Sequence, residues 1–384
     1  MGHLGEHRIL LGRPFLPPFA DSADQLRELW ETRQLTNNSS FARRLRRELC
    51  NHLGVDHLSL VANGTLGLLL ALRALKITGE VITTPFTFVA TSHALLWSGL
   101  KPVFVDIDPD TLNIDPNRIE ASITPATSAI LAVHCFGRRC ATEALELLAR
   151  RHGLKLIYDA AHAFGVTQGG RSVLQCGDAS VLSFHATKVF HTLEGGAVVS
   201  PSPAINQAID RLRNFGFDDE AGGDCVDAGI NAKLNEMNAV VGLLSLPYMK
   251  RLHAERAHIA HLYRQGLQAV EWLRCLPSFE GENYSYFPIL VNRHAPINVA
   301  LIQDHLSRHG IVSRRYFHPL VSSLPPYRHL PSAQPAHLPV AHSVAERVLC
   351  LPIHSEMSEA DVHRVVVSLK ALAAGKQASL PRIS

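Results

Sequence analysis

One lysine stands where it could act as a nucleophile. Lys188 follows an apolar segment, Ala179 to Phe184, that is typical of a β-strand, and Glu194-Gly195-Gly196 comes six residues later. A lysine just beyond a strand of an open sheet lies at the edge where ligands bind, and its amine can lose its proton there and attack a carbonyl. Most lysines, however, stay in solvent. Alone, this segment fits a Schiff-base lysine or a surface lysine.

A carboxylate follows a second apolar strand. Asp159 comes directly after Leu154 to Tyr158, in which only Lys155 is polar, and Ala160-Ala161-His162 comes next. Because the strand is almost entirely apolar, we expect the carboxylate to emerge from a buried strand at the carboxyl edge of the sheet. Such an aspartate either caps a loop or holds a cation in a partly dry site.

A third group could bind a phosphate. Asn63-Gly64-Thr65 separates an expected strand from an expected helix. Glycine lets the chain turn, and the amides of Gly64 and Thr65 open a helix N-terminus, which attracts anions. Turns of this kind are also common without a ligand. Gly67 inside the helix indicates close packing, since glycine is unfavourable there.

Pyridoxal phosphate needs all three kinds of group at once. It requires a lysine for its aldehyde, a carboxylate against its pyridine nitrogen, and amide and hydroxyl donors for its phosphate. Ser183 lies just before Lys188 and can add a hydroxyl. An aromatic ring could stack on the cofactor, and either Phe86 or Phe88 could do so or belong to the core.

Regular alternation of strands and helices would position these groups. It predicts βαβ units, a mostly parallel sheet and helices on both faces, hence an α/β fold. The expected strands are Leu58–Ala62, Val81–Thr83, Val103–Val105, Ala129–Val133, Leu154–Tyr158 and Val181–Phe184. The expected helices between them are Thr65–Leu75, Val89–Trp97 and Thr142–His152.

The remainder of the chain predicts a smaller α+β domain. A long helical pattern from Leu234 to about Val270, interrupted at Pro247, would connect the two domains. The expected strands beyond it are Tyr284–Val291 and Val312–Phe317, and the helices are Asn298–His309, Val340–Leu349 and Glu359–Ala373. We therefore predict an N-terminal arm (1–20), a large domain that binds the cofactor (21–245) and a small C-terminal domain (246–384).

Composition excludes several classes of protein. Of 384 residues, 46% are hydrophobic and 18% charged, the balance of a globular protein, and the formal net charge is only +3. Without a long basic tract, nothing indicates nucleic acid or a membrane surface as partner. Arg43, Arg44, Arg46 and Arg47 could contact a phosphate or form the solvated face of an amphipathic helix.

The cysteines indicate a reducing compartment. There are seven, an odd number without paired spacing. Cys135 and Cys140 are too isolated to predict a metal site. The N-terminus lacks the apolar core of a secretory signal, and no apolar run is long enough to span a membrane. We expect a cytoplasmic protein.

Together the motifs resemble one known family. From about Pro14 to Val366 the chain is similar to the DegT-type sugar-nucleotide aminotransferases, which are fold-type I pyridoxal-phosphate enzymes. The motifs are Asn63-Gly64-Thr65, Thr84-Pro85-Phe86-Thr87-Phe88, Asp159-Ala160-Ala161-His162, Ser183 to Lys188 with Glu194-Gly195-Gly196, and Gly229-Ile230-Asn231-Ala232-Lys233.

The resemblance assigns roles to individual residues. It implies that Lys188 bonds to the cofactor aldehyde and that Asp159 pairs with the pyridine nitrogen. Phe88 would stack on the ring, and His162 would lie beside it. The phosphate would bind Gly64, Thr65 and Ser183 in the same chain. Asn231 would reach the phosphate of the neighbouring subunit's cofactor, which implies a homodimer with shared sites.

The resemblance also implies a reaction. In one branch of the family histidine replaces the lysine and the reaction is deoxygenation, so Lys188 argues for transamination. The string Phe184 to Phe190 is similar to enzymes that act at C4 of dTDP-4-keto-6-deoxy sugars, with L-glutamate as the implied donor. In Arg315 to Leu320 the resemblance implies sugar contacts from Tyr316 and His318, although tyrosine is usual at position 318. The expected pathway is deoxyamino-sugar biosynthesis for a polysaccharide or antibiotic.

Two kinds of alternative stay open from the sequence. One is another pyridoxal-phosphate aminotransferase that acts on a different keto sugar, at C3 or C4, or on a keto-cyclitol. The other is a non-catalytic regulator with the same fold.

Overall fold

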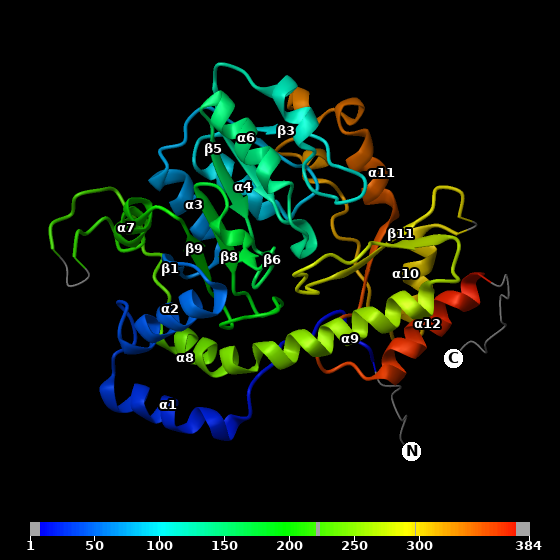
Figure 1. The fold of residues 1–384 in the computed structure, drawn as a ribbon, viewed down its shortest axis with the longest axis horizontal. Helices are drawn as coiled ribbons and strands as arrows, with labels where there is room; N and C mark the ends of the chain where they lie inside the picture. Colours follow the sequence, from blue (N-terminus) through cyan, green and yellow to red (C-terminus); the bar gives the residue numbers. More distant parts are fainter. Residues whose placement is uncertain (1–7, 220–222, 296, 374–384) are drawn as a thin grey trace.

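The computed structural model describes residues 8–219, 223–295 and 297–373. A seven-stranded sheet lies at its centre, with helices on both faces (Figure 1). The strand order is β1-β9-β8-β5-β4-β2-β3. The strands are β1 (Leu58–Val61), β2 (Glu80–Thr83), β3 (Lys101–Phe104), β4 (Thr127–Val133), β5 (Lys155–Asp159), β8 (Ala179–Ser183) and β9 (Gly196–Val199). Only β9 runs against the others, which confirms the predicted α/β fold with a mostly parallel sheet.

The strands are buried on both faces because alternate side chains enter opposite cores. In β8, Leu182 joins a core with α2 (Ser40–Leu53) and α8 (Glu236–Ser245). Its neighbour Val181 joins the opposite core with α3 (Gly64–Ala74), α4 (Val89–Trp97) and α7 (Pro203–Leu212). The remaining helices of this half are α1 (Phe19–Thr32), α5 (Pro116–Ile119) and α6 (Thr142–His152).

Two glycines permit the close packing around β8. A Cβ added to Gly67 in α3 would lie 2.8 Å from Val181 Cγ1, which confirms the close approach predicted for this position. Gly196 begins β9 between the ends of two strands, since it pairs with both Val61 and Ser183. A Cβ there would lie 2.7 Å from the carbonyl oxygen of Leu182. The carboxyl ends of β1 and β8 therefore meet at a glycine.

A second, antiparallel sheet has the order β10-β11-β12. Its strands are β10 (Leu273–Cys275), β11 (Phe287–Val291) and β12 (Val348–Leu351). Helices α9 (Met249–Leu267), α10 (Val299–Arg308) and α12 (Glu359–Ala373) share its core, and α11 (Pro339–Arg347) precedes β12. Helix α9 runs from the side of the large sheet to the small one (Figure 1). A short hairpin, β6 (Thr167–Gln168) with β7 (Arg171–Ser172), completes the strands of the described chain.

Two expectations for this region are wrong. The segment 312–317 is not a strand, because only Arg314 bridges to Cys350 before the chain turns away. The expected helix Val340–Leu349 ends at Arg347, and the apolar residues after it pair with β11. The interruption at Pro247 is confirmed, since a 3₁₀ turn (Leu246–Tyr248) separates α8 from α9. The domain boundary at 245/246 falls at this turn and stays a prediction.

The arginines of α2 lie on a solvated face. Phe41, Leu45 and Leu49 face the core with at most 1% of their surface exposed. Arg44, Arg46 and Arg47 have carboxylate oxygens within 4.0 Å, from Glu28, Asp210 and Glu48 respectively. The structure thus favours the solvated face over a phosphate contact.

Among the described helices, none combines the length and apolarity needed to cross a membrane.

Candidate active site

Lys188 projects from a loop that is anchored on both sides. After β8, Phe184 and Phe190 are both buried, and their rings meet edge to face with centroids 5.0 Å apart. Between them the chain turns tightly, with the amide of Lys188 donating to the carbonyl of His185 at 2.9 Å. Burial lowers the pKa of Lys188 to about 8, although the charge of Asp159 acts in the opposite direction. The local fold therefore holds a readily deprotonated amine beside a carboxylate.

Asp159 ends β5 and is 7% exposed. Thr91 Oγ1 donates to its Oδ2 at 2.7 Å, and the amide of Ala161 donates to its Oδ1 at 3.1 Å. Burial raises the pKa of Asp159, and these two hydrogen bonds and the charge of Lys188 lower it. Of the two roles open from the sequence, the amide of Ala161 shows the loop cap, and burial near the charge of Lys188 is also compatible with a carboxylate that holds a cation.

The turn before α3 presents free amides to the same edge. Asn63 caps the helix by accepting a hydrogen bond from the amide of Leu66 at 2.9 Å. That bond satisfies the third helical position and leaves the amides of Gly64 and Thr65 pointing out of the helix N-terminus. A Cβ on Gly64 would lie 3.1 Å from the Cβ of Ser183, so the turn and the Ser183 hydroxyl are neighbours. This arrangement fits a phosphate group.

The two phenylalanines of the 84–88 segment differ in burial. Phe86 is fully buried and packs edge to face against Phe136 and Phe317. Phe88 stands at the N-cap of α4 with 59% of its surface exposed. Phe86 thus belongs to the core, and Phe88 has the free ring face that stacking on a cofactor requires.

His162 is buried among aromatic rings. The amide of Phe136 donates to its Nδ1 at 3.2 Å, and the hydroxyl of Tyr286 lies 3.4 Å from its Nε2. The ring of Phe317 is parallel to it, with centroids 6.1 Å apart. Burial places the pKa of His162 well below its usual value, and Lys188 lowers it further. The imidazole therefore stays neutral near pH 7.

The C-terminal segment reaches this site through residues that the sequence did not single out. Tyr316 is half-buried and packs edge to face on Tyr286, with ring centroids 5.8 Å apart. Phe317 lies on His162, whereas His318 is exposed. Phe317 belongs to the segment Arg315 to Leu320, in which only its two neighbours were expected to have a role. No motif pointed to Tyr286, Phe136 or Thr91.

Asn231 lies between α7 and α8 in the chain. It is exposed and bridges to Asn214. Its neighbour Ala232 accepts a hydrogen bond from the amide of Ala62 at 2.8 Å, so the segment runs beside the turn at Asn63. An exposed position is compatible with a contact to a second subunit.

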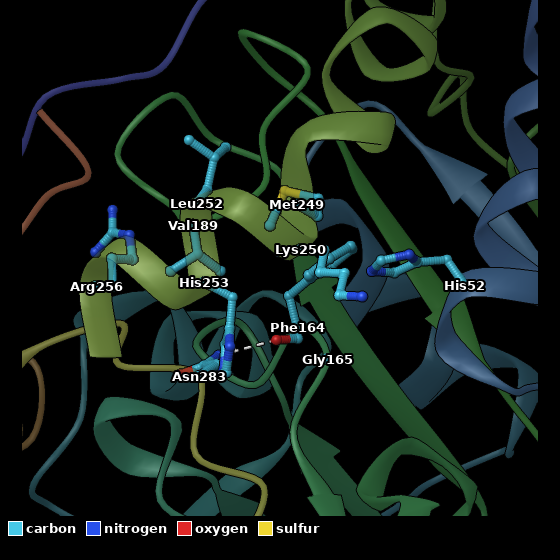
Figure 2. A pocket seen from close by; sticks show the side chains of 10 residues that line it. All are labelled: His52, Phe164, Gly165, Val189, Met249, Lys250, Leu252, His253, Arg256 and Asn283. Atoms are coloured by element: carbon cyan, nitrogen blue, oxygen red, sulfur yellow. Dashed lines mark hydrogen bonds between the residues drawn. The ribbon is translucent and has the colours of Figure 1, made fainter. Parts of the chain in front are cut away.

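A pocket of about 210 Å³ lies next to Val189, the residue after Lys188 (Figure 2). Val189 forms part of its wall, and α9 supplies Lys250, His253 and Arg256. The guanidinium of Arg256 donates to the carbonyls of Tyr284 and Ile353, which indicates a structural role. None of the predicted site residues lines this pocket, so the candidate active site is at the sheet edge instead.

Comparisons with known proteins agree with this geometry. Residues 20–370 match the model of the DegT/DnrJ/EryC1/StrS aminotransferase family. The chain is 44% identical over 376 residues to dTDP-4-amino-4,6-dideoxy-D-glucose transaminase of Escherichia coli, covering 97% of this chain and 100% of that protein. The crystal structure of DesI with its TDP-sugar product superimposes with a TM-score of 0.91 at 37% identity, covering 96% of this chain and 94% of that one.

A further relative was solved with a cofactor. NtdA of Bacillus subtilis, with bound pyridoxamine phosphate, is 26% identical at a TM-score of 0.84, covering 96% of this chain and 86% of that one. The cofactor of the family is pyridoxal phosphate, of which this is the aminated form. The amine of Lys188, the buried carboxylate of Asp159 and the amides at Gly64 and Thr65 fit its aldehyde, ring nitrogen and phosphate. The chain is a member of the DegT/DnrJ/EryC1/StrS aminotransferase family.

Proposed function

We propose that this enzyme transfers an amino group from L-glutamate to C4 of dTDP-4-keto-6-deoxyglucose. The observation that carries the proposal is Lys188, an amine whose pKa burial lowers to about 8, placed beside Asp159 at the carboxyl edge of the sheet. Similarity over the whole chain to a dTDP-4-amino-4,6-dideoxy-D-glucose transaminase supports the choice of sugar.

Pyridoxal phosphate, when bound, supplies the aldehyde that takes up the amino group and a ring that withdraws electrons from the carbon losing its proton. Lys188 Nζ then moves that proton, as general base and later as general acid. With a pKa of about 8, about a tenth of the Lys188 amine is uncharged at pH 7, against about one part in three thousand at an unperturbed lysine pKa. We expect ping-pong kinetics, since the enzyme carries the amino group between two substrates.

The other residues would bind and orient. Asp159 keeps the ring nitrogen protonated, and the amides of Gly64 and Thr65 with the hydroxyl of Ser183 hold the phosphate. Phe88 would cover one face of the ring. Neutral His162 would contact it as a hydrogen-bonding group rather than as a charge. Tyr316 and His318 would contact the sugar, in the segment that Phe317 fixes against His162.

We further propose a cytoplasmic homodimer with shared active sites. Asn231 would reach the neighbouring subunit's cofactor phosphate, and its exposed apolar neighbour Ile230 would be covered by the partner. All seven cysteines are free, as expected in a reducing compartment. Sedimentation at twice the monomer mass would support the dimer, and a monomer with full activity would contradict it.

A product assay tests the reaction. The purified protein is incubated with glutamate and, side by side, with nucleotide-linked 4-keto and 3-keto sugars and a keto-cyclitol. We expect 2-oxoglutarate and the 4-amino sugar from dTDP-4-keto-6-deoxyglucose. Turnover of only another ketone would replace this substrate with that one. A protein that binds the cofactor and turns over no ketone would favour the non-catalytic regulator.

Replacing the lysine tests the site. Lys188→Ala should abolish both turnover and the visible absorbance of the bound cofactor, because it removes the amine that we assign to the bond with the cofactor. Lys76→Ala, at an exposed lysine, is the matched control and should retain both. Normal turnover by Lys188→Ala would show that the assignment is wrong.

A further inference from the structure

Two hydroxyl groups in a row support the carboxylate of Asp159. Thr91 Oγ1 lies 2.7 Å from Asp159 Oδ2, and Thr87 Oγ1 lies 2.8 Å from Thr91 Oγ1. Thr91 is 0% exposed and Thr87 is 3% exposed. A hydroxyl has a single proton, so Thr91, which donates to the carboxylate, must accept the hydrogen bond that Thr87 donates. The two threonines therefore form a directed chain that ends on Asp159.

This chain fixes the orientation of the carboxylate. Thr91 donates to one oxygen of Asp159 and the amide of Ala161 donates to the other, at 3.1 Å. Because each oxygen has one protein donor, rotation of the carboxylate about its Cβ–Cγ bond would break at least one hydrogen bond. Each oxygen keeps a second lone pair for another donor.

The chain also offsets the effect of burial on the carboxylate charge. Burial raises the pKa of Asp159, and the hydrogen bond from Thr91 is the largest influence that lowers it. A protonated Asp159 would not hold a proton on a neighbouring ring nitrogen, because its charge would be lost. Thr91 lies in the first turn of α4, whose N-cap is Phe88. The start of this one helix would therefore contribute two residues to the candidate site.

We propose that Thr91, backed by Thr87, is a positioning residue that orients the Asp159 carboxylate toward the ring nitrogen of the cofactor. The proposal rests on the function proposed above, because it assumes that Asp159 pairs with that nitrogen. Thr91 lies outside the five motifs of the sequence, whereas Thr87 belongs to the motif Thr84 to Phe88.

The test compares cofactor binding in three variants. Thr91→Val removes the hydroxyl and keeps the shape of the side chain, whereas Thr91→Ser keeps the hydroxyl. Thr83→Val is the matched control, because buried Thr83 donates to the carbonyl of Leu131 at 2.8 Å and not to a carboxylate. Two quantities are measured: the dissociation constant of pyridoxal phosphate, by titration of the protein stripped of cofactor, and the pH midpoint of the visible absorbance of the bound cofactor.

Thr91→Val should bind pyridoxal phosphate more weakly, by up to about 100-fold, the upper bound set by one lost hydrogen bond to a charged group. The pH midpoint should rise. The absorbance reports loss of the proton from the nitrogen that would join Lys188 to the cofactor, and a ring nitrogen without its own proton favours that loss less. Thr91→Ser should stay within about threefold of the unaltered protein. Thr83→Val should lose thermal stability and keep both the affinity and the midpoint.

A folded Thr91→Val with unaltered affinity and midpoint would overturn the proposal. If Thr91→Val does not fold, Thr87→Val replaces it in the test: a smaller shift in the same two quantities supports the chain, and no shift refutes it. Failure of the unaltered protein to bind pyridoxal phosphate at all would instead refute the proposed function.

Discussion

The pH dependence of cofactor capture follows from the burial of Lys188. Only the uncharged amine attacks an aldehyde, so the rate at which the stripped protein captures pyridoxal phosphate should follow the uncharged fraction of Lys188. Burial lowers the pKa of Lys188 to about 8, against an ordinary lysine value near 10.5. Because the shift is downward, the amine becomes reactive at a lower pH than a lysine in solvent.

The two pKa values predict different dependences of the uncharged fraction of Lys188 on pH. With a pKa of about 8, the uncharged fraction rises about ninefold from pH 6 to 7 and only about 1.1-fold from pH 9 to 10. With an unperturbed value, it would still rise about eightfold over that last interval. The interval between pH 9 and 10 therefore discriminates most sharply.

Stopped-flow absorbance of the bound cofactor measures the capture rate across this range. A blocked lysine derivative in solution, run in parallel, provides the rate of an unperturbed amine and corrects for titration of the cofactor itself. Lys188→Ala should show no visible band at any pH. A corrected rate that still rises about eightfold between pH 9 and pH 10 would refute the idea that burial activates this lysine.

Two further predictions concern the framework of the site. Gly196→Ala should lower the free energy of unfolding by about 2 kcal/mol or more, since the added Cβ would lie 2.7 Å from the carbonyl oxygen of Leu182. Gly12→Ala, whose Cβ would meet nothing within 4 Å, is its control, and equal urea midpoints would contradict the argument. Asp106→Ala should lower the free energy of unfolding by about 2–4 kcal/mol, because its buried carboxylate accepts hydrogen bonds from two amides at the N-terminus of α11, each at 2.8 Å. Asp110→Ala, at an exposed aspartate, should lower the free energy of unfolding by about 1 kcal/mol or less. Similar losses from the two variants would exclude a capping role for Asp106.

The predicted strands were confirmed where local pattern decides structure. Strands β5 and β8 lie between turns and are buried on both faces, so their apolar runs could be recognised without knowledge of their neighbours. Strand β12 could not be, because its residues continue a helical pattern and become a strand only by pairing with β11. The segment 312–317 has strand-forming composition, but it makes only one bridge to β12. Pairing across the chain overrode local preference in both cases.

Sequence alone predicted which residues would carry the chemistry. Lys188, Asp159 and the turn at Asn63 each follow a strand, and parallel strands bring their carboxyl ends to one edge, so their convergence could be predicted without coordinates. Tertiary structure alone decided which side chains contact them. Thr91 reaches Asp159 across 68 positions of sequence, and Tyr286 reaches His162 across 124. Such contacts leave no periodic pattern and no fixed spacing in the sequence, because they arise only when separate elements pack together. The cofactor chemistry could therefore be predicted from the sequence, whereas the hydrogen bonds and ring contacts around these residues required the fold.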